Sequence, residues 1–378
     1  MGEVWHWILT FLIYFFSALG VIIFLVITHE LGHFIAARLA GVKCPEFFVG
    51  FGPRIWSTKR GDTEFGVKWI LAGGYVKVLG MNPEEEISPE DFPHSYKGVS
   101  YGKRFWIIFS GSLVHVLLAL LIIFFAIWLI GYPNPDERTT TLISVGQYMD
   151  ETQGEETPAY MAGLQRKDTL LAMDGQEVSD WEEVSSFIKE HPGQEVTLLI
   201  ERDGQPMEVQ VQLATLEDGT GYLGISTDFY MEQYSFLGAI GKTGEWWWET
   251  TTGIAKSIGK LFSLSTFKQL LGISPPTEER PQTVVGITYT AGQLLDAGVF
   301  YLLYLLALVC LFLAYINLVP LPPLDGGHLA VLGWERITGR EVDMRKLYPV
   351  AVAVLAFFVI LFILTLRLDI MNIINPFP

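Results

Sequence analysis

Residues 4–33 read VWHWILTFLIYFFSALGVIIFLVITHELGH, and this stretch decides the fold class. From Val4 to Thr28 it contains no Asp, Glu, Lys or Arg. About 20 such apolar residues are enough for a helix to cross the hydrocarbon core of a bilayer. The next five residues, His29 to His33, place three ionisable side chains directly after the apolar run. Such groups at a membrane span are costly unless they are paired or bind something, so they predict a functional site.

Three more uncharged stretches of similar length follow in the 378-residue chain, at Phe105 to Gly131, Ala297 to Leu324 and Leu347 to Leu366. Half of all residues are hydrophobic and 13% are aromatic, which is typical of a membrane protein. We therefore predict a polytopic α-helical membrane protein with four transmembrane helices. We expect the first helix to be retained rather than cleaved as a signal peptide, because it lacks a basic leading region and a small-residue cleavage site.

The formal net charge of −16 is concentrated in one segment. Between Tyr132 and Gly298 there are 26 acidic and 10 basic residues, whereas the rest of the chain holds 15 of each. Cytoplasmic loops of membrane proteins are enriched in Lys and Arg. The connection from Glu335 to Lys346 carries four basic residues, and the loop from Lys43 to Arg104 carries nine, together with eight acidic ones. We therefore expect both loops in the cytoplasm, and the acidic segment and both termini outside.

The loop after the first span contains short runs rich in β-branched and aromatic residues that are interrupted by glycines, such as TEFGVKWI at 63–70 and AGGYVKVLG at 72–80. This pattern predicts strands joined by turns between Val42 and Val78. A small sheet close to the membrane is expected, provided that its backbone groups pair with one another or line a cavity.

The acidic segment contains a compact α+β module, expected at residues 140–228. Its predicted strands are Thr169–Met173, Val196–Glu201 and Met207–Leu213, and they alternate with Asp-Gly turns. Its predicted helix is Trp181–Glu190. Pro158-Ala159, Ala162-Gly163-Leu164, Asp168 and Asp174-Gly175 together resemble the signature of bacterial PDZ domains, with Lys167 in place of a usual glycine. Gly221–Ile225 resembles the carboxylate-binding loop of such domains, and an ordinary hairpin is the alternative.

Residues 232–296 follow this module. Tyr234 to Leu271 has a helical pattern that is too polar to span a bilayer, and it contains Trp246, Trp247 and Trp248. It is expected either to lie in the outer membrane interface or to pack on the α+β module.

His29-Glu30-Leu31-Gly32-His33 is an HExxH motif. On a helix, two histidines four residues apart project from one face and can bind one Zn²⁺, with Glu30 beside the metal as general base. A catalytic zinc uses three protein ligands and one open position. Asp325 is the candidate third ligand, because the prolines in NLVPLPPLDGG (317–327) would break the third span and free its end to turn. Solvated histidines at a helix end and a plain loop aspartate are the alternatives.

Together, HExxH and NLVPLPPLDG resemble the two signatures of the site-2 protease family of intramembrane zinc metalloproteases. The inserted PDZ-like module, the four spans and the FVGFGPRIWST stretch resemble its bacterial RseP-type branch, in particular the mycobacterial-type enzymes with a single PDZ domain. The resemblance implies that His29, His33 and Asp325 hold Zn²⁺ and that Glu30 is catalytic. It also implies that Asn317, Pro320, Pro322, Gly73 and Gly74 contact an extended substrate strand.

The resemblance further implies a multi-pass protein of the cell membrane whose partners are the lipid bilayer and single-span substrates, such as an anti-sigma factor or a remnant signal peptide, with no nucleic acid. The active site is expected toward the cytoplasm. The four spans are expected in residues 1–41, 105–132, 297–327 and 347–378, the last of which includes the tail. Between them lie the β segment (42–104), the PDZ-like module (140–228), the linker (232–296) and a cytoplasmic loop (328–346).

One position departs from the family pattern. The second span carries Ser110-Gly111-Ser112-Leu113-Val114-His115 where the family often has AGPxxN, so His115 replaces an asparagine. The residue is either an extra polar group near the metal or, as we favour, a core histidine bonded to a backbone carbonyl.

Two other functions compete with a protease. A PDZ membrane adaptor with a purely structural metal would not need a base such as Glu30, and a metal transporter would need a polar path beyond this single cluster. Glu30 is present, and the four spans show no polar path beyond this cluster, so both comparisons favour the protease.

Overall fold

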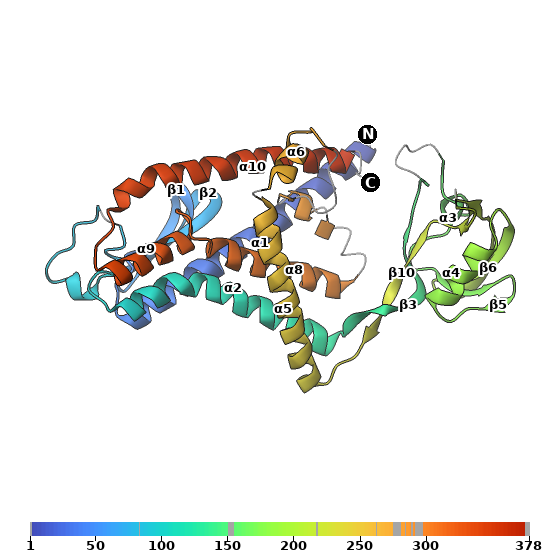
Figure 1. The fold of residues 1–378 in the computed structure, drawn as a ribbon, viewed down its shortest axis with the longest axis horizontal. Coiled ribbons are helices and arrows are strands. Elements are labelled where there is room, and N and C mark those ends of the chain that lie inside the picture. Colours follow the sequence, from blue (N-terminus) through green and yellow to red (C-terminus); the bar gives the residue numbers. More distant parts are fainter. Residues whose placement is uncertain are drawn as a thin grey trace. The chain divides into compact units, whose positions relative to one another are not determined.

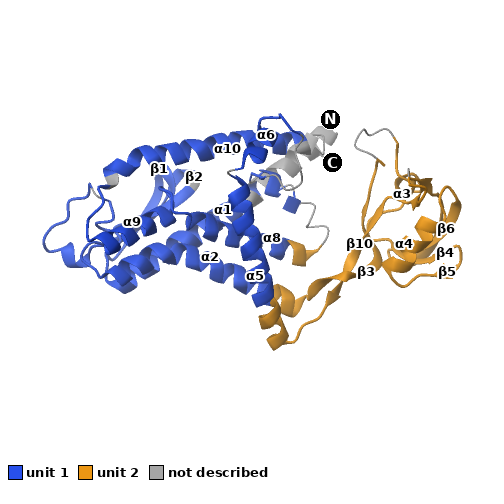
Figure 2. Cartoon of the chain, in the orientation of Figure 1, with its two compact units in different colours: residues 1–124, 243–292, 302–376 blue, residues 125–242, 293–301, 377–378 orange. Residues whose placement is uncertain are grey.

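The computed structural model describes residues 2–374 apart from residues 83, 150–154, 217, 262, 275–280, 284, 289 and 292–297. The chain divides into two compact units (Figure 2). The first unit comprises residues 1–124, 243–292 and 302–376, and the second comprises residues 125–242, 293–301 and 377–378.

Four helices of the described chain are long and apolar enough to cross a membrane (Figure 1). They are α1 (Gly2–Ala40), α2 (Tyr101–Leu129), α8 (Val299–Asn317) and α10 (Tyr348–Ile374). Between 6% and 33% of the residues in their most apolar windows are buried within the chain. A helix that is hydrophobic all round but little buried by its own protein fits a membrane span, so the four predicted helices are confirmed.

Two of these helices differ in length from the apolar stretches that predicted them. α1 continues through His29 and His33 to Ala40, so the metal motif lies inside an unbroken helix. α8 ends at Asn317 instead of running to Leu324, because Pro320 and the prolines after it lack the N–H and clash with the preceding turn. A tight turn follows, and then α9 (Asp325–Thr338) begins at the candidate ligand.

The predicted strands after α1 form a twisted antiparallel pair, β1 (Glu46–Arg60) and β2 (Thr63–Lys77). Residues 46–49 pair on one side with residues 64–67 and on the other with residues 74–77, so the end of β2 is an edge of the sheet. The sheet packs on α1. A small core of buried side chains joins the two elements to α2, and its members are Ala37, Ala40, Val42, Cys44, Val78 and Ile107.

The second unit contains a sheet with the strand order β10-β3-β4-β6-β7, in which all neighbours are antiparallel. Its elements are β3 (Tyr132–Val145), α3 (Pro158–Met161), β4 (Thr169–Met173), β5 (Gln176–Glu177), α4 (Trp181–Glu190), β6 (Glu195–Arg202), β7 (Gln205–Gln212), β8 (Ala214–Thr215), β9 (Gly221–Tyr222) and β10 (Ile225–Glu232). The predicted helix and strands are confirmed to within one or two residues. Apolar side chains of β4, β6 and α4 form the core, including Leu170, Leu198 and Val184.

The PDZ-like signature residues hold this unit together. Asp168 is fully buried, and its two carboxylate oxygens accept hydrogen bonds of 2.7 Å from Nε and Nη2 of Arg202. The N–H of Gln165 donates to the same carboxylate at 2.7 Å. Lys167, at the usual glycine position, has a left-handed backbone with φ of 72°. The strand β3 begins at Tyr132 and pairs with β10, so the ordered sheet extends beyond the expected start at residue 140.

The linker forms α5 (Phe236–Leu261) and α6 (Leu264–Leu270), while residues 262, 275–280, 284, 289 and 292–296 of the expected linker lie outside the described residues. Within the first unit, α5 packs on α8. Nε1 of Trp247 donates to the hydroxyl of Tyr315 at 3.0 Å, and this hydroxyl also bonds Oγ1 of Thr251 at 2.7 Å. Two short 3₁₀ helices, η1 (Phe92–His94) and η2 (Met344–Leu347), also belong to the first unit.

Candidate metal centre

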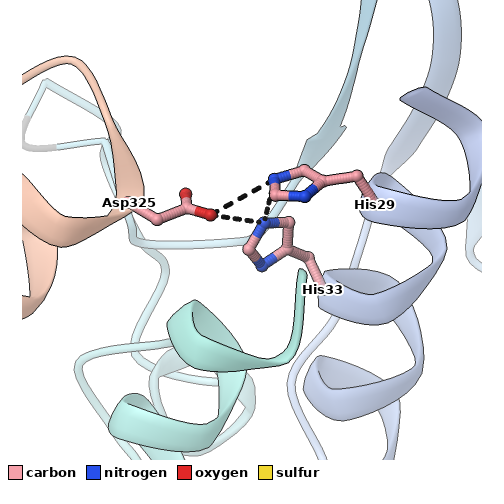
Figure 3. A group of neighbouring side chains, drawn as sticks. All are labelled: His29, His33 and Asp325. Carbon is pink, nitrogen blue, oxygen red and sulfur yellow. Dashed lines mark hydrogen bonds and ion pairs between the residues drawn. The ribbon is translucent and has the colours of Figure 1, made fainter. Parts of the chain in front are cut away.

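The three predicted ligands meet in one place, although Asp325 lies far from the two histidines in the sequence (Figure 3). Nε2 of His29 and Nε2 of His33 are each 3.2 Å from Oδ2 of Asp325. The two Nε2 atoms are themselves 3.2 Å apart. The three atoms therefore form an almost equilateral triangle, and the two imidazoles and the carboxylate point toward its centre.

This triangle fits a zinc ion. Tetrahedral Zn²⁺ binds nitrogen and oxygen at about 2.0–2.1 Å, which places neighbouring ligand atoms about 3.3 Å apart. The observed separations of 3.2 Å agree with that value. Two imidazoles and one carboxylate are also the type of donor set found at catalytic zinc, where the fourth position stays open.

The helical spacing and a carbonyl of α2 orient the histidines. His29 and His33 are one turn apart on α1, so their rings lie one above the other on the same face. Nδ1 of His33 donates to the carbonyl oxygen of Ile107 on α2 at 2.7 Å. Since a donor on Nδ1 leaves the lone pair on Nε2, this bond presents Nε2 to a metal.

A close crossing of α1 and α2 forms one wall of the site. A methyl group at Gly111 would lie 2.7 Å from Cε1 of His33 and 2.8 Å from Cε1 of His29. On the facing helix, a methyl group at Gly32 would lie 2.6 Å from the carbonyl oxygen of Ser110. These separations are too short for any side chain at the crossing, so the absence of two side chains lets α2 reach the histidine rings.

Asp325 is positioned by the turn between α8 and α9. The N–H of Leu324 donates to Leu321 and the N–H of Gly327 donates to Leu324, at 3.0 and 2.9 Å. A methyl group at Gly326 would overlap the carbonyl oxygens of Leu318 and Val319. Because Gly326 has no side chain, the first turn of α9 packs closely against the proline-rich segment. This packing directs the Asp325 carboxylate at the histidines.

Glu30 lies beside the three candidate ligands but does not belong to their cluster. Its Oε2 accepts a hydrogen bond of 2.9 Å from the N–H of Val76, in the edge strand of the sheet. Gly74, two residues earlier in the same strand, is close enough that a methyl group there would lie 3.5 Å from Cγ of Glu30 and 2.8 Å from Cγ1 of Val26. The edge of β2 thus lies directly against the face of α1 that carries the HExxH motif.

The residues predicted to bind substrate occupy two places. Gly73 and Gly74 lie in the edge strand, Gly73 beside the ring of Phe51 and Gly74 against α1. Asn317 is the half-buried last residue of α8, and Pro320 and Pro322 lie in the turn that leads to Asp325. Both places flank the metal ligands along the chain or in space. Their part in substrate binding stays a prediction.

Several residues that shape the site carried no predicted role. Gly111, Gly32 and Gly326 matter because they lack side chains, and Ile107 acts through its backbone carbonyl. The glycines in Ser110-Gly111-Ser112 and after Asp325 were a signal for close approach, whereas the carbonyl of Ile107 has no signal in the sequence. His115 is buried, and its Nε2 lies 2.9 Å from the carbonyl oxygen of Leu25, as the favoured interpretation expected.

Comparison with known proteins agrees with this chemistry. The sequence matches peptidase family M50 over residues 17–362. It is 30% identical to the zinc metalloprotease Rip1 of Mycolicibacterium smegmatis over 386 residues, which cover 92% of this chain and 95% of that protein. It is 26% identical to the zinc metalloprotease RasP of Geobacillus kaustophilus over 403 residues, which cover 85% of this chain and 89% of that protein.

Among solved structures, the PDZ domain of an SdrC-like protein from Listeria innocua is 21% identical, with a TM-score of 0.21. The match covers 25% of this chain and 99% of the Listeria chain.

The family match includes both motifs that supply the candidate ligands, and the resemblance seen in those motifs is confirmed. The ligand triangle has the donor set and the spacing that zinc requires. The chain therefore belongs to peptidase family M50 and is a zinc metalloprotease.

Proposed function

We propose that this protease cleaves the transmembrane segments of single-span membrane proteins, with the peptide bond cut inside the bilayer. The position of the metal centre carries this proposal. His29 and His33 lie in the window Leu19–Ala40 of α1, and Asp325 follows α8, so the ligands belong to helices of membrane-spanning length. A soluble peptidase on an anchor would carry its ligands far from any span.

In the proposed reaction, Glu30 is the base. Zinc, when held by His29, His33 and Asp325, supplies a Lewis acid that activates water and polarises the peptide carbonyl. Glu30 takes the proton of the attacking water, and the 2.9 Å hydrogen bond from Val76 holds its carboxylate in place. Glu30 can then return that proton to the amine that leaves.

The edge of β2 is proposed to receive the substrate. In an antiparallel ladder, N–H and C=O groups of alternate residues point to the partner strand and away from it. The N–H of Val76 points away, since it donates to Glu30, and Gly74 stands two residues before it in regular register with Val49. An unwound substrate strand could pair with Gly74, while Asn317 and the proline-rich turn contact it from the other side.

We further propose that the metal centre lies toward the cytoplasm and the PDZ-like unit lies outside. The excess of basic residues in the two expected cytoplasmic loops supports this orientation. Exposed apolar side chains on the sheet next to α1 support its contact with the membrane, and they include Phe51, Ile55, Trp56, Trp69 and Ile70.

The PDZ-like unit is proposed to select substrates whose outer part has already been trimmed, such as anti-sigma factors or remnant signal peptides. Deletion of Pro158 to Leu213 should then let long and trimmed substrates be cleaved alike. If the deleted protein keeps its preference for trimmed substrates, the unit has another role.

The decisive experiment expresses the full chain beside a set of single-span reporters and compares it with Glu30→Gln and Asp325→Asn. Both variants should leave the reporters uncut, while Glu86→Gln, in an exposed loop, should cleave like the unchanged protein. Equal processing by Glu30→Gln and the unchanged protein would remove Glu30 from the mechanism and with it the proposed intramembrane protease.

A further inference from the structure

The two histidine ligands differ in what their outer ring nitrogen contacts. A histidine that binds zinc through Nε2 carries its proton on Nδ1, and this N–H ordinarily donates to a carbonyl, a carboxylate or water. For His33 the acceptor is the carbonyl oxygen of Ile107, at 2.7 Å. For His29, Nδ1 is buried and has no hydrogen-bond partner among the residues that the structure describes. His29 therefore holds a buried donor that still requires an acceptor.

His115 is the neighbouring ring. Its centroid lies 5.2 Å from that of His29, the two planes are inclined by 46°, and the residue is 2% exposed. Nε2 of His115 lies 2.9 Å from the carbonyl oxygen of Leu25. A carbonyl oxygen can only accept, so this contact places the proton of a neutral His115 on Nε2 and the lone pair on Nδ1. Nδ1 of His115 is also buried and has no partner among the described residues.

We propose that His115 is a positioning residue for the metal centre, whose Nδ1 accepts the Nδ1–H of His29 through one buried water. Nδ1 of His29 is a donor because Nε2 of that ring is the metal-binding atom. Nδ1 of His115 is an acceptor because Nε2 of that ring carries the proton that is donated to Leu25. Buried polar groups are almost always paired, and a water between two such atoms is a common solution. This inference rests on His29 being a ligand, as the proposed function requires.

The same ring is tied to the backbone of α1 just before the metal motif. Leu25 precedes His29 by one helical turn, and its carbonyl oxygen also accepts a hydrogen bond of 2.9 Å from Oγ1 of Thr28. His115 therefore holds α2 to the turn of α1 that presents His29, while its other nitrogen orients the His29 ring. A histidine that only filled space would need neither contact.

Three substitutions separate these roles. His115→Phe keeps a ring of similar size but has no polar atom. His115→Asn places a carbonyl oxygen near the position of Nδ1 but cannot reach Leu25. His115→Gln reaches Leu25 with its amide nitrogen but leaves no acceptor at the position of Nδ1. Ile123→Val, at a buried position farther along α2, is the matched control for a small core change.

The test measures the zinc dissociation constant of the full chain in detergent by competition with a chelator, and the thermal stability of the metal-free protein. His115→Phe and His115→Gln should weaken zinc binding about 10- to 100-fold, the usual cost of losing an outer partner of a ligand. His115→Asn should stay within about threefold of the unchanged protein, as should Ile123→Val, by the same comparison.

Zinc affinity within about threefold of the unchanged protein for a folded His115→Phe would overturn the proposal, since a lost outer partner costs more than that. So would tighter binding by His115→Gln than by His115→Asn, and this comparison decides the question if the Phe variant does not fold. His29→Ala separates the two levels of inference. Unchanged zinc affinity in His29→Ala would refute the ligand assignment itself, and the role of His115 would fall with it.

Discussion

Gly111 of α2 lies against the ring of His33 on α1, so closely that a methyl group at Gly111 would stand 2.7 Å from Cε1 of that ring. The carbonyl of Ile107, one turn earlier on α2, accepts the hydrogen bond from Nδ1 of the same ring. The second span therefore packs against the candidate metal centre and bonds one of its histidines, although no candidate ligand among the described residues lies on α2.

Gly111→Ala should push the histidine rings apart and abolish most of the activity. Misplacing a catalytic group by about 1 Å typically costs about 100-fold in rate, so we expect a loss of that size. Reporter cleavage and zinc content of the purified protein measure it. Gly102→Ala, also in α2 but with open space around it, is the control and should keep full activity. Full activity in Gly111→Ala would mean that the two helices are not this close.

Gly326→Ala should displace Asp325 without touching the histidines. The added methyl group overlaps the carbonyl oxygens of Leu318 and Val319, so the first turn of α9 must move outward. We expect zinc binding and cleavage to fall together, the cleavage about 100-fold. Gly333→Ala lies in the same helix with open space around it and should change neither quantity. Equal zinc binding and equal cleavage in Gly326→Ala and Gly333→Ala would contradict the role of Gly326 in positioning Asp325.

Lys167→Gly should stabilise the PDZ-like unit. Lys167 has a φ of 72°, a backbone conformation that costs an L-residue about 1–2 kcal/mol and costs glycine almost nothing. After the greater entropy of an unfolded glycine is subtracted, we expect a gain of about 1 kcal/mol. Hydrogen exchange of the β4 amides in the full protein reports the local free energy of unfolding.

Lys189→Gly, inside α4, should have the opposite effect, a loss of about 1 kcal/mol, because glycine is a poor helix residue. Faster exchange in Lys167→Gly than in the unchanged protein would contradict the assignment of strain to this turn.

Arg202→Ala should destabilise the same unit strongly. The substitution leaves the fully buried carboxylate of Asp168 without the guanidinium that bonds both of its oxygens. This hydrogen-bonded pair raises the pKa of Arg202 above its usual value, so the guanidinium stays charged at every pH at which the protein is used. Breaking such a buried pair costs about 3–5 kcal/mol.

Hydrogen exchange in the full protein measures that change, from the β6 amides for Arg202→Ala and from the β1 amides for the control variant, Arg54→Ala. Arg54→Ala removes an ion pair in which Nη1 of Arg54 lies 2.6 Å from Oε1 of Glu64, but the Arg54 side chain is 59% exposed. Its effect should stay below about 1 kcal/mol, as for other surface pairs. Similar losses in both variants would show that burial does not control the contribution of the Asp168–Arg202 pair.

The elements and the candidate ligands were accessible from the sequence because they depend on local rules. A span needs about 20 apolar residues, and HExxH puts two imidazoles on one helical face whatever surrounds them. The same holds for α4, whose residues 181–190 follow a helical pattern, and for the end of α8, where consecutive prolines cannot continue a helix. Asp325 was predictable as a candidate from its place after those prolines, but not its distance from His29.

The sequence by itself determined the four apolar helices of membrane-spanning length, the inserted α+β unit and the residues that are candidate zinc donors. Only the tertiary structure decided that Oδ2 of Asp325 stands 3.2 Å from both histidines, that Gly111 touches their rings, and that His115 faces His29. The physical reason is that hydrophobic spacing and helical periodicity act between neighbours in the chain. The shape of a metal centre depends on how closely separate helices pack. A glycine at the helix crossing or one backbone carbonyl that accepts a hydrogen bond determines the distance between those helices.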